Sequence, residues 1–239
     1  MTTLDTPRSI DFRGFRPEAL QFLVDLTANN ERSWFQPRKG EYERLLKEPL
    51  EQLCVAVAER FEARGIPLQA DPARSPFRIH RDVRFSKDKS PYKTNIGASF
   101  PWIGESTVAP EGESSRHVAG GYFHLSPEGS FIGGGMWHPE PARLAAFRSL
   151  VADDPASVHA VLQDPGFRDM FGDVSGDRLK RVPRGYAPDH PEAELLKLKD
   201  VGFHRTLDEA ELFSPRLPDT LADALGAALP VLRFLNRLA

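Results

Sequence analysis

Apolar residues recur at helical intervals in the first quarter of the chain. The segment that starts at Pro17 and ends at Asn29-Asn30 places its apolar residues on one face: Leu20, Phe22, Leu23 and Leu26. From Pro37 to Arg64 the apolar residues step by 4, 4, 3, 4 and 4 positions: Tyr42, Leu46, Leu50, Leu53, Val57 and Phe61. Because this period continues through Pro49, we expect one helix kinked there, or two helices with Pro49 in the first turn of the second. Gly65 follows as the expected C-cap.

The middle of the chain has shorter apolar runs that are typical of strands. They cover residues 77–85, 96–103, 118–125 and 130–137. Ser126-Pro127-Glu128-Gly129 is a turn sequence between the last two runs, so these are expected to form a hairpin. The stretch from Gly104 to Arg116 is rich in Gly, Ser, Glu and Pro and is expected to be an exposed loop. Strands joined by short or loop connections favour an antiparallel sheet.

The last hundred residues return mainly to helical patterns. We expect helices at Pro139–Ala152, Pro155–Leu162, Pro191–Lys199 and Pro218–Leu238, and a strand at Val201–Leu207. This order predicts an α+β fold, with an antiparallel sheet of about four to six strands and helices packed mainly on one face. Residues 1–14 are expected to form a flexible N-terminus and residues 15–239 a single domain.

Composition narrows the class of protein without naming a reaction. The 239 residues carry a net charge of -3, which excludes a uniform polycation of the histone type. Cys54 is the single cysteine, so no intrachain disulfide or cysteine-based zinc cluster forms, and its helical neighbours indicate a buried thiol. Residues 1–12 lack the apolar run of a signal peptide, and no window suits a transmembrane helix. We therefore expect a cytoplasmic protein with no membrane partner.

Positive charge is concentrated in residues 74–93. The window holds seven cationic side chains: Arg74, Arg78, Arg81, Arg84, Lys87, Lys89 and Lys93. Asp82 and Asp88 are its two carboxylates, so its net charge is +5 and the other 219 residues must sum to -8. Arginine binds phosphate and carboxylate groups through two-point contacts. The segregated charge therefore predicts an anion site.

The expected strand geometry suggests how such a site is built. Alternate residues share a face, so Arg78, His80, Asp82 and Arg84 would lie opposite Phe77, Ile79 and Arg81. We expect Arg78, Arg81 and either Arg84 or Lys87 to bind the anion, and Asp82 to orient an arginine or His80. His80 and Tyr92 are the candidate proton-transfer groups if the protein is an enzyme, which the sequence does not decide. The candidate ligand-binding residues are Arg78, Arg81, Asp82, Arg84, Lys87, Lys89, Lys93 and Arg181.

Several interpretations of the basic segment stay open. The leading one is a pocket for a phosphorylated or carboxylated small molecule. A second is a nucleic-acid-binding module that uses the stripe from Arg74 to Lys93, with Tyr92 and Phe85 for stacking. A third is a non-catalytic interaction protein whose basic strand meets an acidic partner, and a solvated face with local ion pairs would need no ligand. The acidic remainder of the chain repels a long polyanion, which favours the small anion.

Other motifs lead to narrower expectations. Gly133–Gly135, inside a strand pattern, indicates a bulge or tight sheet packing, or else the close approach of a ligand. Backbone N–H groups at Trp137-His138, just before a helix, could meet an anion. His124 and His80 could face a common pocket. A second basic cluster could converge on the first: Arg178, Lys180, Arg181 and Arg184. The histidines show no metal-ligand spacing and no dinucleotide fingerprint occurs, so we predict no metal and no cofactor.

The run Arg-Asp-Val-Arg-Phe-Ser-Lys-Asp-Lys-Ser-Pro-Tyr-Lys-Thr-Asn, residues 81–95, resembles the signature of a known family. Further stretches similar to that family are Phe22-Leu23 to Trp34-Phe35, Gly121–Leu125, Gly133–Trp137 and Leu179–Tyr186. The family is domain-of-unknown-function family 2461, uncharacterised conserved proteins of bacteria and fungi. The resemblance spans roughly residues 15–235 and implies a single domain, but it implies no activity.

Overall fold

The computed structural model describes residues 12–84, 86–105 and 118–238. At its centre lies a four-stranded antiparallel sheet in the order β1-β2-β3-β4. The strands are β1 (Ile96–Pro101), β2 (Gly120–Leu125), β3 (Ser130–Met136) and β4 (Val201–Leu207). These strands and the 126–129 hairpin turn confirm the prediction, and each strand end lies within two residues of its expected position.

Helices accompany this sheet, which confirms the predicted α+β class. The described helical elements are α1 (Pro17–Ala28), α2 (Arg32–Phe35), η1 (Gln36–Arg38), α3 (Lys39–Tyr42), η2 (Glu43–Lys47), α4 (Glu48–Ala63), α5 (Pro141–Asp153), α6 (Pro155–Leu162), α7 (Pro165–Phe171), α8 (Ala193–Leu196), α9 (Glu209–Leu212), α10 (Leu217–Ala227) and α11 (Leu229–Asn236). Pro49 lies in the first turn of α4, as one of the two alternatives predicted. The preceding η2 is π-helical, and in the first turn of α4 the missing N–H of Pro49 costs no helical hydrogen bond.

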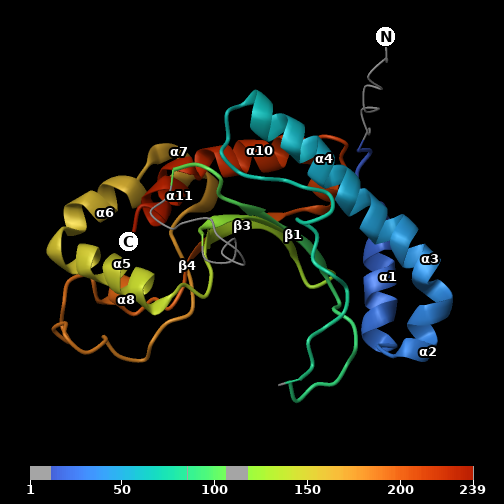
Figure 1. Ribbon diagram of the computed structural model, residues 1–239, viewed down its shortest axis with the longest axis horizontal. Coiled ribbons are helices and arrows are strands. Elements are labelled where there is room, and N and C mark those ends of the chain that lie inside the picture. Colours follow the sequence, from blue (N-terminus) through green and yellow to red (C-terminus); the bar gives the residue numbers. More distant parts are fainter. Residues whose placement is uncertain (1–11, 85, 106–117, 239) are drawn as a thin grey trace, which may run out of the picture.

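The helices that contact the sheet pack on one face, as predicted. Figure 1 shows α4 and α10 lying across the same side of the arched sheet. On that side, Phe100 of β1 meets Phe61 of α4 with ring centroids 5.6 Å apart, and Phe203 of β4 meets Phe167 of α7 at 5.3 Å. Complete burial of a phenylalanine side chain stabilises a fold by about 1.5–3 kcal/mol. The alternate residues of each strand point to the opposite face, which none of these helices of the described chain covers.

The strand expected at residues 77–85 does not form over its described part, residues 77–84, and this is a correction. In residues 76–84 the structure has two isolated bridges, Pro76 with Ala98 of β1 and His80 with Tyr92. Pro76 and Pro91 have no backbone N–H, so neither can donate to a continuous ladder. Instead, residues 79–93 double back on themselves: Arg81 N–H donates to the Pro91 carbonyl at 3.0 Å, and Lys93 N–H donates to the Ile79 carbonyl at 2.8 Å.

The C-terminal helix also differs from its prediction. One helix was expected from Pro218 to Leu238, but α10 ends at Ala227 and α11 begins at Leu229. Pro230 lies in the first turn of α11, where its missing N–H costs no helical hydrogen bond. The short helices α7 and α9 lie where no helix was predicted. No helix in the described part of the chain is long and apolar enough to cross a membrane.

The triple glycine of β3 is explained by close packing between strands. A Cβ on Gly134 would lie 2.5 Å from the Gly120 carbonyl oxygen, and one on Gly133 would lie 2.5 Å from that of Phe203. Gly135 has a φ of +119°, which side chains rarely tolerate. Tight sheet packing, one of the alternatives expected, accounts for these glycines.

Two other predicted segments fall largely outside the described residues. These are the N-terminus 1–14 and the loop from Gly104 to Arg116. Within the first of them, Phe12 is described and is buried, with its ring 5.7 Å from that of Phe15.

Candidate functional site

A hollow of about 370 Å³ lies between the end of α1 and the basic segment. It is lined by Thr27, Asn30, Arg81, Asp88, Ser90, Tyr92, Lys93, Thr94 and Asn95. The side chain of Asn30 holds the two walls together, because its Nδ2 donates to the Tyr92 carbonyl at 3.0 Å and its Oδ1 accepts from the Tyr92 N–H at 3.1 Å. Of the predicted ligand-binding residues, Arg81 and Lys93 line this hollow.

Arg81 shares the hollow with a carboxylate. Its guanidinium donates to the Asp88 carboxylate and reaches Ser86 Oγ at 3.5 Å. Asp88 also accepts from the Ser90 hydroxyl at 2.6 Å and from the Ser90 N–H at 2.9 Å. These bonds, first from Ser90 and then from Arg81, hold the pKa of Asp88 well below its usual range. Asp88 is therefore charged and already neutralised locally at physiological pH.

Three other predicted residues are bonded outside the hollow. Arg84 grips Asp82 with Nε at 3.0 Å from Oδ1 and Nη2 at 2.7 Å from Oδ2, and these bonds lower the pKa of Asp82 to about 2. Asp82 is therefore bonded to an arginine, and its expected role beside a bound anion stays a prediction. Lys89 Nζ donates to the Val83 carbonyl at 2.9 Å. None of the three is among the residues that line the hollow.

Lys93 and Arg78 are two cations without a carboxylate partner in the described part of the chain. Lys93 Nζ lies 5.2 Å from the ring centroid of Phe77, a cation–π contact. Burial lowers the pKa of Lys93, and the positive charge of Arg78 lowers it further. Phe77 is 46 % exposed although the strand pattern placed it with buried Ile79. The uncompensated positive charge of the basic segment is therefore concentrated at Arg78 and Lys93, together with exposed Lys87.

The two candidate proton-transfer residues have different surroundings. The Tyr92 ring is 1 % exposed and stacks on Phe35 with centroids 4.0 Å apart. His80 is exposed, with its ring 5.2 Å from that of Tyr92. Tyr92 therefore serves first as a core residue that anchors the segment.

A polar group on the open face of the sheet was not predicted. The Tyr122 hydroxyl lies 3.1 Å from His124 Nδ1, and Asn95 Nδ2 lies 3.4 Å from the same nitrogen. Burial lowers the pKa of His124, opposed by the charge of Glu128, and raises the pKa of Tyr122. The Asn95 amide nitrogen can only donate, so its contact with Nδ1 favours the neutral ring that carries its proton on Nε2. The sequence analysis singled out His124 but paired it with His80. Tyr122 and His124 are two positions apart in a strand, so their side chains share a face, and this spacing could have predicted their contact.

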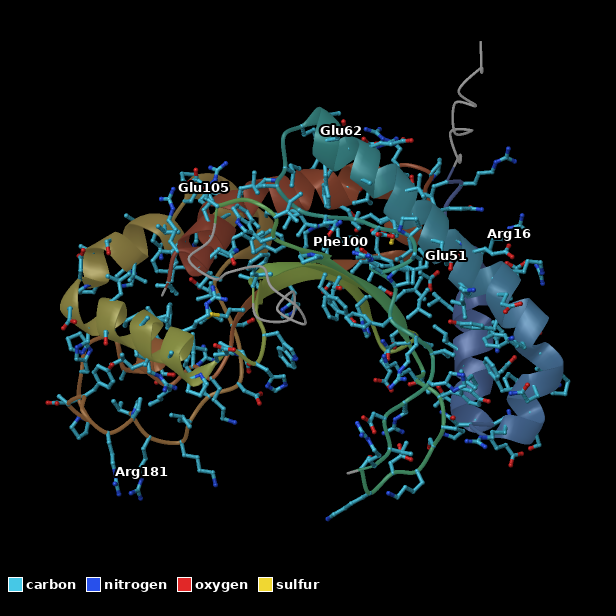
Figure 2. All side chains as sticks on the ribbon, in the orientation of Figure 1. Arg16, Glu51, Glu62, Phe100, Glu105 and Arg181 are labelled. Atoms are coloured by element: carbon cyan, nitrogen blue, oxygen red, sulfur yellow. The ribbon has the colours of Figure 1, made fainter. Side chains whose placement is uncertain are left out.

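The remaining predicted groups lie elsewhere. Figure 2 shows Arg181 at the outer edge of its loop, pointing away from the sheet, and Arg181 does not line the hollow. In the same cluster, Arg178 lies 3.6 Å from a Glu194 carboxylate oxygen. The His138 N–H, expected to be available to an anion, donates to the Asp200 carboxylate at 2.8 Å. No group of three or more potential metal ligands occurs within residues 12–84, 86–105 and 118–238.

The family described as "Conserved hypothetical protein (DUF2461)" matches residues 18–234. This chain belongs to the DUF2461 family. The match confirms the resemblance carried by residues 81–95, the segment that forms most of the hollow in this DUF2461 protein. No curated protein and no solved structure matches the chain.

Proposed function

We propose that this DUF2461 protein binds a small phosphorylated or carboxylated molecule at the hollow, through Arg81 and Lys93, which line it, and through Arg78, which lies close to Lys93. The observation that carries the proposal is the pair formed by Arg78 and Lys93. Arg78 is close enough to depress the pKa of Lys93, and neither cation has a carboxylate partner among the described residues. Two adjacent like charges, one of them partly buried, disfavour each other, and a bound anion reverses that cost.

The walls of the hollow also suit an anion. Arg81 contributes guanidinium N–H groups, and Ser90, Thr94 and Asn95 contribute hydroxyl or amide donors. Asp88 opposes an anion, but its charge is paired with Arg81, and its other carboxylate oxygen accepts hydrogen bonds from Ser90. Charge-assisted hydrogen bonds from Arg81 and Lys93 to a bound anion would be about twice as strong as neutral hydrogen bonds.

Size favours a small molecule over a nucleic acid. The hollow of about 370 Å³ falls within the range of about 300–1,000 Å³ typical of small-molecule sites. The stacking residues expected of a nucleic-acid module lend it no support: Tyr92 is covered by Phe35, and Phe85 lies outside the described residues. The chain outside residues 74–93 is acidic and repels a long polyanion.

Calorimetric titration with inorganic phosphate and with citrate, at low salt, tests the proposal. Removing one charge-assisted contact costs about tenfold in affinity or more, so we expect that loss in both Arg78→Gln and Lys93→Gln. Arg84→Gln is the matched control, because its guanidinium is bound to Asp82 outside the hollow. The proposal fails if wild type binds neither anion, or if all three variants bind as wild type does.

A further inference from the structure

Five aromatic rings form a row across the open face of the sheet. The ring centroids are 6.0 Å apart for Phe77–Tyr122, 5.7 Å for Tyr122–Phe131, 4.7 Å for His124–Phe131 and 5.7 Å for Phe131–His204. They come from the segment beside β1, from β2, from β3 and from β4 in turn. Tyr122, His124 and Phe131 are half-buried, while Phe77 and His204 are exposed. We call these five residues the ring row.

Glycines beneath the row let the rings lie against the sheet. A Cβ on Gly97 would lie 2.6 Å from the Tyr122 hydroxyl oxygen, and one on Gly133 would lie 3.0 Å from His204 Cβ. Gly133 is paired with Tyr122 on one side and with His204 on the other. Side chains at these positions would push the rings outward, so the glycines keep the surface of the sheet flat under the row.

The row adjoins the cations of the proposed anion site. Phe77, its first member, lies under the Lys93 ammonium. Asn95, which lines the hollow, contacts His124 in the middle of the row. The helix contacts of Phe100 and Phe203 lie on the other face of the sheet. Figure 1 shows α4 and α10 on that other side as well. One patch therefore combines unpaired positive charge with adjacent half-exposed rings.

We propose that the anion bound at Arg78 and Lys93 carries a planar aromatic or heteroaromatic ring, which lies on the ring row over Tyr122, His124 and Phe131. This inference rests on the proposed function and narrows its ligand class. Flat ligand rings stack on aromatic side chains whatever their substituents, so the row selects for a ring and the cations select for the charge. A neutral His124 supports such stacking, and its Nε2–H is available as a donor to a ring substituent.

The choice between a free small molecule and a longer chain of nucleotides follows from charge. Only Arg78, Lys93 and Lys87 are cations without a bonded partner in the described part of the basic segment. A single-stranded nucleic acid needs a positively charged groove that follows its backbone for several nucleotides. The patch offers one cationic site for an anion next to one row of rings. An anion with a single ring therefore matches it better than a nucleic acid strand does.

Titration with phenyl phosphate and with methyl phosphate tests this inference. Both carry the anion, and only the first carries a ring. Stacking of a ring on an aromatic side chain strengthens binding, so we expect phenyl phosphate to bind about tenfold more tightly than methyl phosphate. Phe131→Leu keeps an apolar side chain and removes the central ring, and we expect it to abolish this preference while methyl phosphate affinity stays unchanged. Trp34→Leu, which removes a ring under a different cation, Arg38, should keep the preference.

Each outcome of this experiment decides something. Equal affinity for both phosphates in wild type overturns the ring inference and leaves the anion site standing. A preference for phenyl phosphate that survives Phe131→Leu overturns the placement on the ring row. Failure of both phosphates to bind overturns the proposed function, and the ring inference with it. Affinity for oligothymidylate that rises steadily with its length replaces the small molecule with single-stranded nucleic acid and overturns both proposals.

Discussion

Asn30 and Tyr92 are joined by two hydrogen bonds although they lie 62 positions apart in the sequence. The Asn30 amide donates to the Tyr92 carbonyl at 3.0 Å, and its oxygen accepts from the Tyr92 N–H at 3.1 Å. Tyr92 also stacks on Phe35, so one residue of the basic segment is held by both its backbone and its ring. The end of α1 thereby fixes the position of neighbouring Lys93.

Replacing Asn30 tests whether this bond pair holds the segment in place. Asn30→Ala leaves a partly buried N–H and carbonyl of Tyr92 without partners, so we expect a loss of about 1–3 kcal/mol in the free energy of unfolding. Asn29→Ala is the control: its exposed side chain bonds to the Asp25 carbonyl of α1 and to no other described residue. Urea unfolding of the two variants measures both losses. Equal losses would show that the bonds to Tyr92 contribute nothing specific.

Gly97 should not tolerate a side chain. A Cβ there would lie 2.6 Å from the Tyr122 hydroxyl and 2.8 Å from the Phe123 carbonyl oxygen, and the carbonyl cannot move aside cheaply. Gly97→Ala should therefore destabilise the protein by about 1–3 kcal/mol, the usual cost of overpacking. It should also move the Tyr122 hydroxyl away from His124 Nδ1. Gly40→Ala is the matched control, because nothing lies within 4 Å of its Cβ position.

In Gly40→Ala the helix propensity of alanine should leave stability unchanged or raise it by up to about 1 kcal/mol. Thermal unfolding measures both glycine variants. Retention of full stability in Gly97→Ala would contradict the close contact between β1 and Tyr122.

The lowered pKa of His124 predicts a pH dependence of stability. Its pKa in the folded protein lies below the ordinary value of 6.5, because burial disfavours the charged ring. Below pH 6.5 the unfolded chain therefore takes up a proton that the folded protein does not, and stability falls until the pH reaches the folded pKa. Above pH 6.5 this contribution is constant.

His124→Gln should remove the part of the stability loss below pH 6.5 that comes from protonation of His124 in the unfolded chain. Urea unfolding of wild type and variant at pH 7.5, 6.5 and 5.5 provides the comparison, and we expect the wild-type curve to fall more steeply below pH 6.5. Parallel curves over the whole interval would show that His124 is not buried as described.

Local patterns in the sequence were sufficient for most of the fold. The period of 3.6 located α1 and α4, the turn at 126–129 located the hairpin, and Val201–Leu207 coincides with β4. Such patterns depend on neighbours within a few residues, which the sequence contains directly. Pro230 is a local signal for the break between α10 and α11. The apolar period continues through it, so one continuous helix was predicted there.

The candidate site was predictable only in part. The basic segment and Arg81 were located by charge, whereas the bond between Asp82 and Arg84 lies outside the hollow. The described part of the segment is not a strand, so the predicted alternation of faces does not hold: Phe77 is exposed, whereas Ile79, expected on the same face, is buried. The contact of Lys93 with Phe77 and the link between Asn95 and His124 depend on how residues 76–95 fold back against β1 and β2.

By itself, the sequence determined most of the longer helices, the four strands of the sheet, the α+β class and the +5 charge of residues 74–93. Only the tertiary structure decided that Arg84 is bonded to Asp82, that Arg78 and Lys93 have no carboxylate partner among the described residues, and that five rings meet on one face of the sheet. The physical reason is one of range. Periodicity and charge are properties of neighbouring residues, whereas strand register and ion-pair choice are set by many long-range contacts acting together.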